Sequence, residues 1–188
     1  MINPSEIGCQ INLITGKHYE KCRGSCHQES RVMTSRITRD AMLMQIAEIV
    51  ALRGTCSRLS VGAVVTKESR VVSQGYVGSP PGMPHCSEWG CDLEGASLND
   101  VVKGGQKGAH CIRTTHAEMN ALLFAARNGI ATYGSEIYVT HTPCLTCTKA
   151  IITAGVQRVV WGEDYGDVEA TKKLLSKAGI RFGTHSTG

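Results

Sequence analysis

The chain has 188 residues, enough for one compact domain with a real core and too few for two. Its formal charge of +4 is mild, and its lysines and arginines are scattered, so no stripe that would track a nucleic-acid backbone is visible. With aromatic residues at 5%, there are also few side chains on which exposed bases could stack. We therefore expect a small anionic substrate and no nucleic-acid partner.

The nine cysteines require an explanation. No apolar run reaches the roughly 18 residues that span a bilayer, and the N-terminus lacks the apolar core of a signal peptide. These features predict a cytoplasmic protein with no membrane partner. Because cytoplasmic cysteines rarely pair as disulfides, metal binding is the leading explanation for their number.

The first 37 residues show no sustained period of either a helix or a strand. We expect residues 1–37 to be an N-terminal extension that is disordered or not native to the protein. The spacing of Cys22, Cys26 and His27 leaves half of a metal site as an alternative. Residues 38–188 form the predicted domain.

From Thr38 onward the apolar residues recur at clear intervals. RDAMLMQIAEIVALR has a helical period and ends at Gly54, and two β-branched runs around the turn KES predict a hairpin. The predicted elements are a helix at 38–53, strands at 60–66 and 70–76, a Cys/His-rich insert at about 77–113, a helix at 115–128, a strand at 135–141, a helix at 144–154, a strand at 158–162, a helix at 168–178 and a strand near 180–184. This order predicts a three-layer α/β domain with one mixed sheet.

The segment THTPCLTC follows a predicted strand and begins a helix. Cys144 and Cys147 are three residues apart, so on a helix they share a face and can hold one metal ion. Pro143 suits the helix start because its missing N–H would have no intrahelical partner, and the positive end of the helix dipole favours thiolates. Two small residues buried under the sheet are the alternative for this pair taken alone.

The motif HAE lies at the start of the helix predicted at 115–128. His116 and Glu118 point about 200° apart around a helix axis, so both can serve one metal only if it lies off the helix end. The simpler interpretation is a histidine cap followed by an acidic residue in the first turn. However, the strand that follows can bring the helix end with Cys144 to the same place, at the carboxyl edge of the sheet.

The two motifs together predict a catalytic zinc site. Three protein ligands leave one zinc position open, which is typical of catalytic sites. Water bound there has a pKa near 7, and Glu118 would move its proton without binding the metal. The combination H-x-E…P-C-x-x-C is the signature of zinc-dependent base deaminases. The alternative is a non-catalytic zinc-binding nucleotide sensor, which would have no use for Glu118.

The chain resembles the deoxycytidylate (dCMP) deaminases of bacteria and their phages, from about Arg39 to Phe182. HAEMNALLFAA and IYVTHTPCLTCTKAIITAGV place it in the superfamily, whereas the segment GYVGSPPGMPHCSEWGC and the sequence EDYGD at 163–167 favour this family. The resemblance implies a three-layer α/β/α cytidine-deaminase-like fold with a central mixed five-stranded sheet.

The resemblance also implies roles and partners. His116, Cys144 and Cys147 would bind the catalytic zinc, and Glu118 would be the acid and base that hydrolyses dCMP to dUMP and ammonia, supplying the precursor of thymidylate. A homo-hexamer, activated by dCTP and inhibited by dTTP with Mg²⁺, is expected on the same basis. The alternatives are another cytosine nucleotide, a nucleoside or a modified dCMP as substrate, and a polynucleotide base deaminase, which the composition disfavours.

One position departs from the family pattern. The family usually reads GYNGSP, and this chain has Val77 where the asparagine would stand. Losing a hydrogen bond to a charged partner costs about 1.5–3 kcal/mol. We therefore expect altered substrate affinity, effector control or nucleotide choice, unless another side chain supplies the contact.

The same region is expected to contact the substrate. Backbone N–H groups of the loop from Gly78 to Gly82, with Ser79 and Arg113, suit a phosphate group, although these residues are equally typical of turns. Asn120 follows the HAE motif and is a candidate to contact the sugar or to fix the loop. The remaining candidates are Tyr165 and Asp167.

The insert offers more metal ligands than one structural zinc needs. By resemblance, the candidate ligands are Cys56, Cys86, Cys91 and His110, with Cys111 and His85 as alternates. A tetrahedral site would fix a loop that is too polar and Gly-rich to pack alone. Reduced, unligated thiols are the alternative.

Overall fold

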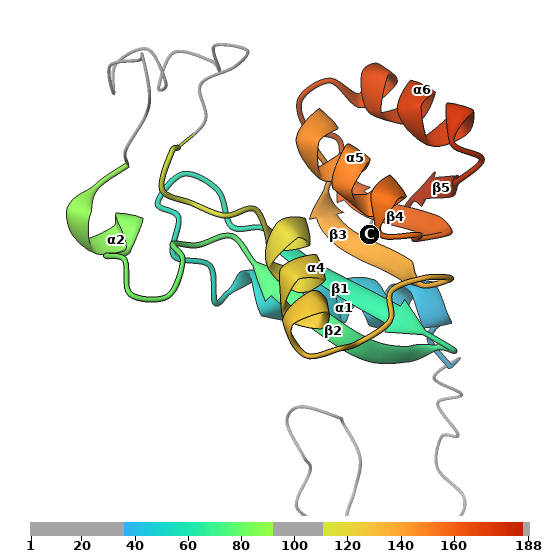
Figure 1. Ribbon diagram of the computed structural model, residues 1–188, viewed down its shortest axis with the longest axis horizontal. Helices are drawn as coiled ribbons and strands as arrows, with labels where there is room; N and C mark the ends of the chain where they lie inside the picture. Colours follow the sequence, from blue (N-terminus) through green and yellow to red (C-terminus); the bar gives the residue numbers. More distant parts are fainter. Residues whose placement is uncertain (1–35, 92–110, 186–188) are drawn as a thin grey trace, which may run out of the picture. The chain divides into compact units, whose positions relative to one another are not determined.

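The computed structural model describes residues 36–91 and 111–185, and the compact unit that holds the sheet begins at Ile37. In chain order its elements are α1 (Arg39–Ala51), β1 (Gly62–Lys67), β2 (Arg70–Tyr76), α2 (Cys86–Trp89), α4 (Ala117–Arg127), β3 (Glu136–His141), α5 (Leu145–Thr153), β4 (Arg158–Glu163), α6 (Val168–Lys177) and β5 (Arg181–Thr184), as Figure 1 shows. No helix in this part of the chain is long and apolar enough to cross a membrane.

The five strands form one mixed sheet in the order β2-β1-β3-β4-β5. Strand β1 runs antiparallel to both of its neighbours, whereas β3, β4 and β5 run parallel to one another. The KES turn closes the β1–β2 hairpin with positive φ angles of 51° at Glu68 and 64° at Ser69, as tight hairpin turns require. The predicted mixed sheet is confirmed, and the short helix α2 within the insert is an addition to the predicted elements.

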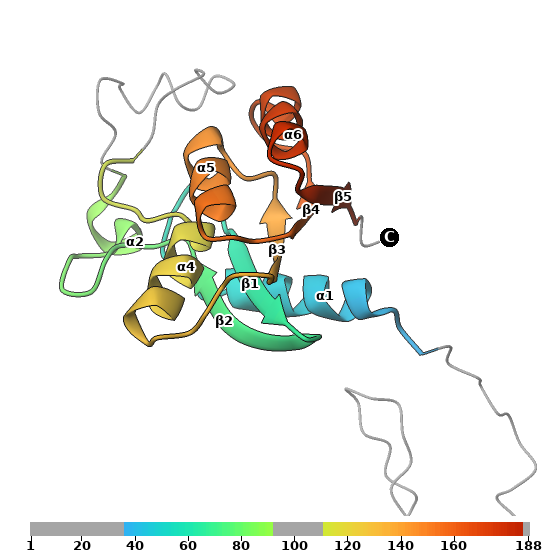
Figure 2. The ribbon, with the colours of Figure 1, turned by 45° about the vertical axis from the view of Figure 1, so that its right-hand side comes forward.

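Helices cover both faces of the sheet. Alternate residues of a strand point to opposite faces, so Val64 packs with α1 whereas Ala63 and Val65 pack with the helices opposite. Figure 2 shows α1 on one side of the sheet and α4 and α5 on the other. The predicted three-layer α/β/α fold is therefore confirmed, with its two cores separated by the sheet.

Helix α4 lies close against β2. A Cβ atom at Gly75 would stand 2.4 Å from both the Ala117 carbonyl oxygen and the Ala121 nitrogen, so only glycine permits this approach. The Ser73 hydroxyl donates to the Ala121 carbonyl at 2.6 Å, and the Asn120 amide donates to the Tyr76 carbonyl at 2.7 Å. These contacts fix the start of α4 relative to the end of β2.

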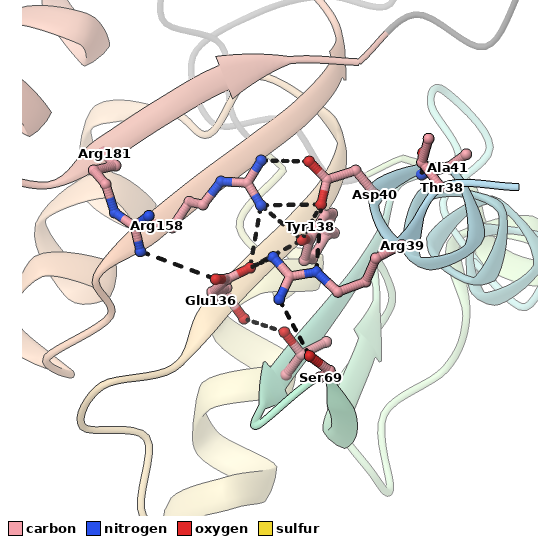
Figure 3. Close-up of polar contacts among 10 residues, drawn as sticks. Thr38, Arg39, Asp40, Ala41, Ser69, Glu136, Tyr138, Arg158 and Arg181 are labelled. Carbon is pink, nitrogen blue, oxygen red and sulfur yellow. Dashed lines mark hydrogen bonds and ion pairs between the residues drawn. The ribbon is translucent and has the colours of Figure 1, made fainter.

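A charged network joins α1 to the sheet at the amino-terminal ends of the parallel strands (Figure 3). Arg158 forms a bidentate pair with Asp40, and it also donates to Glu136 at 3.2 Å. The Tyr138 hydroxyl lies 2.7 Å from Asp40 Oδ1 and 2.9 Å from Glu136 Oε2. Arg39 donates to Glu136 at 2.8 Å. The network therefore ties the first turn of α1 to β3 and β4.

The network keeps both of its carboxyl groups ionised. The hydrogen bond from Arg158 lowers the pKa of Asp40 well below its ordinary range. Burial alone would raise the pKa of Glu136, but hydrogen bonds from Tyr138 and Arg158 and the charge of Arg39 outweigh it, and the pKa is lowered. A carboxyl with a depressed pKa stabilises the fold above its unfolded pKa, and this contribution is lost as the pH falls toward the folded value.

We predict that Asp40→Asn lowers the free energy of unfolding at pH 7 by about 2 kcal/mol, because Arg158 loses its charged partner. The difference from wild type should shrink as the pH falls below about 4, where the unfolded wild-type carboxyl begins to bind its proton. Denaturant unfolding of the metal-free protein between pH 3 and pH 7 measures both effects. Glu169→Gln, at an exposed pair with Lys172, is the control and should cost less than about 0.5 kcal/mol. An equal loss at every pH would contradict the assignment.

Candidate functional site

Three potential metal ligands meet where two helices begin. His116 Nδ1 lies 3.5 Å from Cys144 Sγ and 3.4 Å from Cys147 Sγ, and the three ligand atoms all lie within 4.8 Å of one another. Among the residues that the structure describes, this is the one group of at least three such side chains close enough to share an ion.

The ends of α4 and α5 create this meeting point. His116 is the N-cap residue of α4, and Cys144 is the N-cap residue of α5, so each lies just outside the first helical turn. The Cys147 backbone N–H points at Cys144 Sγ, 3.5 Å away. Both helices present the positive ends of their dipoles to the sulfur atoms, which stabilises thiolates there.

The donor set fits a zinc ion. Tetrahedral zinc has bonds of about 2.3 Å to sulfur and 2.1 Å to nitrogen, which separates the two ligand atoms by about 3.6 Å. The sulfur–nitrogen distances of 3.4 and 3.5 Å match this spacing. Three ligands also leave the fourth tetrahedral position for a small molecule, as in catalytic zinc sites.

The two thiols differ in acidity. A hydrogen bond from the Cys147 side chain, helped by His116, lowers the pKa of Cys144 to about 3. The same hydrogen bond, together with burial, raises the pKa of Cys147. His116 has a raised pKa, because its ring donates to Cys144. A metal ion that binds both sulfurs must displace the proton that Cys144 and Cys147 share in their hydrogen bond.

Glu118 lies directly beside this cluster. Its side chain is buried, with 4% of its surface exposed, and it is within hydrogen-bonding range of the Cys147 side chain. Burial raises the pKa of the Glu118 carboxyl. A carboxyl group with a raised pKa, held beside the ligands but outside the cluster, is suited to carrying a proton.

A pocket of about 260 Å³ opens onto the cluster. Its lining residues are Thr114, Thr115, His116, Met119, Cys144, Thr146 and Cys147. The three threonines offer hydroxyl groups near the metal ligands, and Met119 adds an apolar wall. Such a mixture of apolar surface and a few polar groups is typical of a site for a small molecule.

The matched family model decides what kind of protein has this site. Residues 37–163 match the family described as the cytidine and deoxycytidylate deaminase zinc-binding region. This span includes His116, Glu118 and both cysteines of the cluster. The chain belongs to this family. The family resemblance predicted from the sequence is therefore confirmed.

Relatives of this chain include proteins of bacteria and phages. The ComE operon protein 2 of Bacillus subtilis is 41% identical over 145 residues, covering 77% of this chain and 70% of that protein. The deoxycytidylate deaminase of Mycobacterium phage D29 is 38% identical over 132 residues, covering 69% of this chain and 98% of that protein. The dCMP deaminase of cyanophage S-TIM5, solved in complex with dCMP and dUMP, superimposes with a TM-score of 0.64 at 29% identity, covering 77% of this chain and 95% of that one.

The loop after β2 is hydrogen-bonded to the residue that precedes His116. Gly78 and Thr115 exchange two backbone hydrogen bonds, of 3.1 and 2.8 Å, immediately before His116. The Ser79 hydroxyl donates to the Pro84 carbonyl at 2.8 Å, so it holds the loop together. Val77 is buried, with 7% of its surface exposed, and it is not among the residues that line the pocket. Phosphate or effector contacts at these positions stay predictions.

The other predicted contact residues have partners within the chain. Arg113 donates to the Gly90 carbonyl at 3.2 Å, and Asn120 donates to the carbonyl of Tyr76, the last residue of β2. The predicted roles of both residues in binding stay predictions. Asp167 caps α6 by accepting from the Ala170 N–H at 3.1 Å. Tyr165 is half exposed and packs edge-on against His141, with ring centroids 6.0 Å apart.

The predicted ligands of the insert are brought together in part. The sulfur atoms of Cys86 and Cys111 lie 3.8 Å apart, and Cys111 also interacts with Cys91. Burial, with the neighbouring Cys111, raises the pKa of Cys86 to about 11. His85 Nδ1 is buried and has no hydrogen-bond partner among the residues that the structure describes. His110 lies outside the described residues, as do residues 1–35 of the predicted extension.

Sequence reasoning missed the threonines that surround the cluster. Thr114, Thr115 and Thr146 line the pocket, and their positions next to His116 and between the cysteines could have indicated this. Thr171 of α6 also contacts the loop that leads into Cys144, which we call the cysteine loop. Its hydroxyl donates to the Pro143 carbonyl at 2.9 Å. No local signal in the sequence points to that contact, because 28 residues separate the two groups.

We predict that Cys147→Ser releases one zinc ion per chain, because a serine hydroxyl does not supply the thiolate that zinc prefers. Metal analysis after gel filtration measures the loss. Thr146→Ala, which lies between the two cysteines and removes no ligand, is the matched control and should keep its zinc. Full zinc content in the Cys147→Ser protein would rule out the assigned cluster.

Proposed function

We propose that this protein hydrolyses dCMP to dUMP and ammonia at the His116–Cys144–Cys147 cluster. The observation that carries the proposal is the buried carboxyl of Glu118 beside a group of three potential metal ligands that line a pocket. A purely structural metal site has no need of a buried proton carrier. The substrate is supported by relatives named deoxycytidylate deaminase and by a similar structure that holds dCMP and dUMP.

The residues of the cluster divide the chemistry between them. His116, Cys144 and Cys147 would hold zinc, which when bound supplies a water molecule of lowered pKa. Glu118 takes one proton from the water that adds to C4 of cytosine and passes it to N3. Glu118 then takes the second proton from the new C4 hydroxyl and gives it to the amino group, the C4–N bond breaks, and ammonia leaves. Burial of Glu118 strengthens its interaction with the developing charges.

Several further properties rest on the sequence resemblance. Supply of dUMP for thymidylate synthesis, activation by dCTP, inhibition by dTTP with Mg²⁺ and assembly into a hexamer are proposed on that basis. A cytoplasmic location would keep the cysteines of the cluster reduced, as zinc binding requires. Val77, in place of the asparagine of the family, is the reason to include other cytosine nucleotides in any substrate test.

We also propose a second, structural zinc in the insert. The 3.8 Å spacing of Cys86 and Cys111 equals the separation of about 3.8 Å between two thiolates on tetrahedral zinc. This spacing supports Cys111 as a ligand together with the predicted Cys86. Cys56 and Cys91 are proposed from the resemblance alone, because these cysteines do not gather among the described residues as closely as His116, Cys144 and Cys147 do. His85 Nδ1, which has no hydrogen-bond partner in the described part of the chain, supports that side chain as an alternate. The ion would fix a segment that has little apolar core of its own.

The proposed activity predicts the outcome of one assay. Wild-type protein should release ammonia from dCMP in preference to CMP, deoxycytidine, dCTP and 5-modified dCMP. Glu118→Gln should keep its zinc but lose about 10²–10⁴-fold in turnover, because the amide cannot carry the proton. Glu88→Gln, at an exposed acid of the insert, is the control and should remain active. Turnover by Glu118→Gln at the wild-type rate would contradict the role, and reaction with nucleosides or polymers alone would contradict the substrate.

The second zinc predicts a separate metal count. Wild-type protein should hold about two zinc ions per chain, Cys111→Ser should lose one of them, and Cys111→Ser with Cys147→Ser should lose both. Cys111→Ser should also melt at a lower temperature, because the insert loses its cross-link. A wild-type protein with one zinc, or an unchanged count in Cys111→Ser, would remove the second site.

A further inference from the structure

The cysteine loop is held from behind by a buried threonine. Pro143, immediately before the ligand Cys144, is buried, so its carbonyl cannot turn to water. The Thr171 hydroxyl donates to this carbonyl at 2.9 Å. Thr148 also lies near it, at 3.4 Å, but its hydroxyl makes the shorter bond of 2.9 Å with the Cys144 carbonyl. Thr171 is therefore the principal donor to Pro143.

Thr171 belongs to a segment that makes two further hydrogen bonds with the cysteine loop. The Thr142 N–H donates to the Glu163 carbonyl at 2.9 Å, and the Tyr165 N–H donates to the Thr142 hydroxyl at 3.2 Å. Asp167 caps the first turn of α6 through Ala170, which gives this end of the helix a fixed geometry. The segment from the end of β4 to the first turn of α6 thus encloses the residues just before Cys144.

We propose that Thr171 is a positioning residue for the metal cluster, acting through the Pro143 carbonyl on the orientation of Cys144; this inference rests on the proposed zinc site. The Pro143–Cys144 peptide is planar, so fixing its carbonyl also fixes the direction in which the Cys144 Cα leaves the peptide. The direction of the Cys144 side chain follows from that geometry. Groups outside the ligand shell commonly set how firmly a metal is held in this way.

Two substitutions of Thr171 distinguish this positioning role from a role in packing. The Thr171 side chain is 1% exposed, so both of its branches are buried. Valine at this position keeps the branched shape and replaces the hydroxyl with a methyl group, which cannot donate a hydrogen bond. Serine keeps the hydroxyl and removes the methyl group. A role in packing would make the serine variant the more affected, whereas a role in holding the Pro143 carbonyl makes the valine variant the more affected.

The test is the rate at which zinc passes from the purified protein to a chromogenic chelator, with no substrate present. Thr171→Val should release the zinc of this cluster about tenfold faster than wild type, and Thr171→Ser should release it near the wild-type rate. The Cys147→Ser protein identifies which phase of release belongs to this cluster. Thr153→Val is the matched control, because Thr153 on α5 donates to the Lys149 carbonyl at an exposed position away from the loop; its release rate should be unchanged.

A second measurement keeps the test decisive if the Thr171→Val protein folds poorly. In cobalt-substituted protein, Thr171→Ala should shift the sulfur-to-cobalt absorption bands, and Thr171→Ser should leave them in place. Wild-type release rates and unshifted bands in the hydroxyl-free variants, or equal changes in Thr153→Val, would overturn the proposal. Failure of the wild type to deaminate dCMP would instead overturn the proposed function, because zinc release is measured without substrate.

Discussion

The site depends on the meeting of two helix ends at one edge of the sheet. Helices α4 and α5 lie on the same face, and each begins with a candidate metal ligand in its N-cap position. The missing side chain of Gly75 lets α4 come close to β2, and the hydrogen bonds of Ser73 and Asn120 set where it begins. If either helix shifted along its axis by one turn, about 5.4 Å, His116 and the cysteines could no longer share an ion.

The acidic side chains at the two ends of the sheet lie in different surroundings, which gives them different pKa values. At the amino-terminal ends of the parallel strands, Asp40 and Glu136 are paired with arginines, which keeps both acids ionised and ties α1 to the sheet. At the carboxyl end, Glu118 is buried beside thiols without an arginine among the contacts described for it, and its pKa is raised. An acid with a charged partner stabilises a fold, whereas an acid whose pKa is raised by burial can exchange a proton.

The sequence predicted most elements because their local signals are strong. The helical period before Gly54, the KES turn and the Pro143 helix start each depend on neighbouring residues. The contact residues were harder to predict. Ser79 and Asp167 are candidates for ligand contacts, and in the structure Ser79 donates to the Pro84 carbonyl and Asp167 caps α6. Short polar side chains suit both tasks equally, so the predicted contacts of these residues stay predictions. The network around Arg158 joins residues up to 118 positions apart, so no local pattern could have indicated it.

The residue types and spacings alone determined the family and the candidates for metal ligands and proton carrier, because HAE and PCxxC encode chemistry within a few residues. Only the tertiary structure decided that His116 Nδ1 lies 3.4–3.5 Å from both sulfurs, that Glu118 is buried beside them, and that Thr171 supports their loop. The physical reason is that distance and burial arise from packing between segments far apart in the chain. A hydroxyl group on α6 acquires a partner at Pro143 only when the sheet brings the two together.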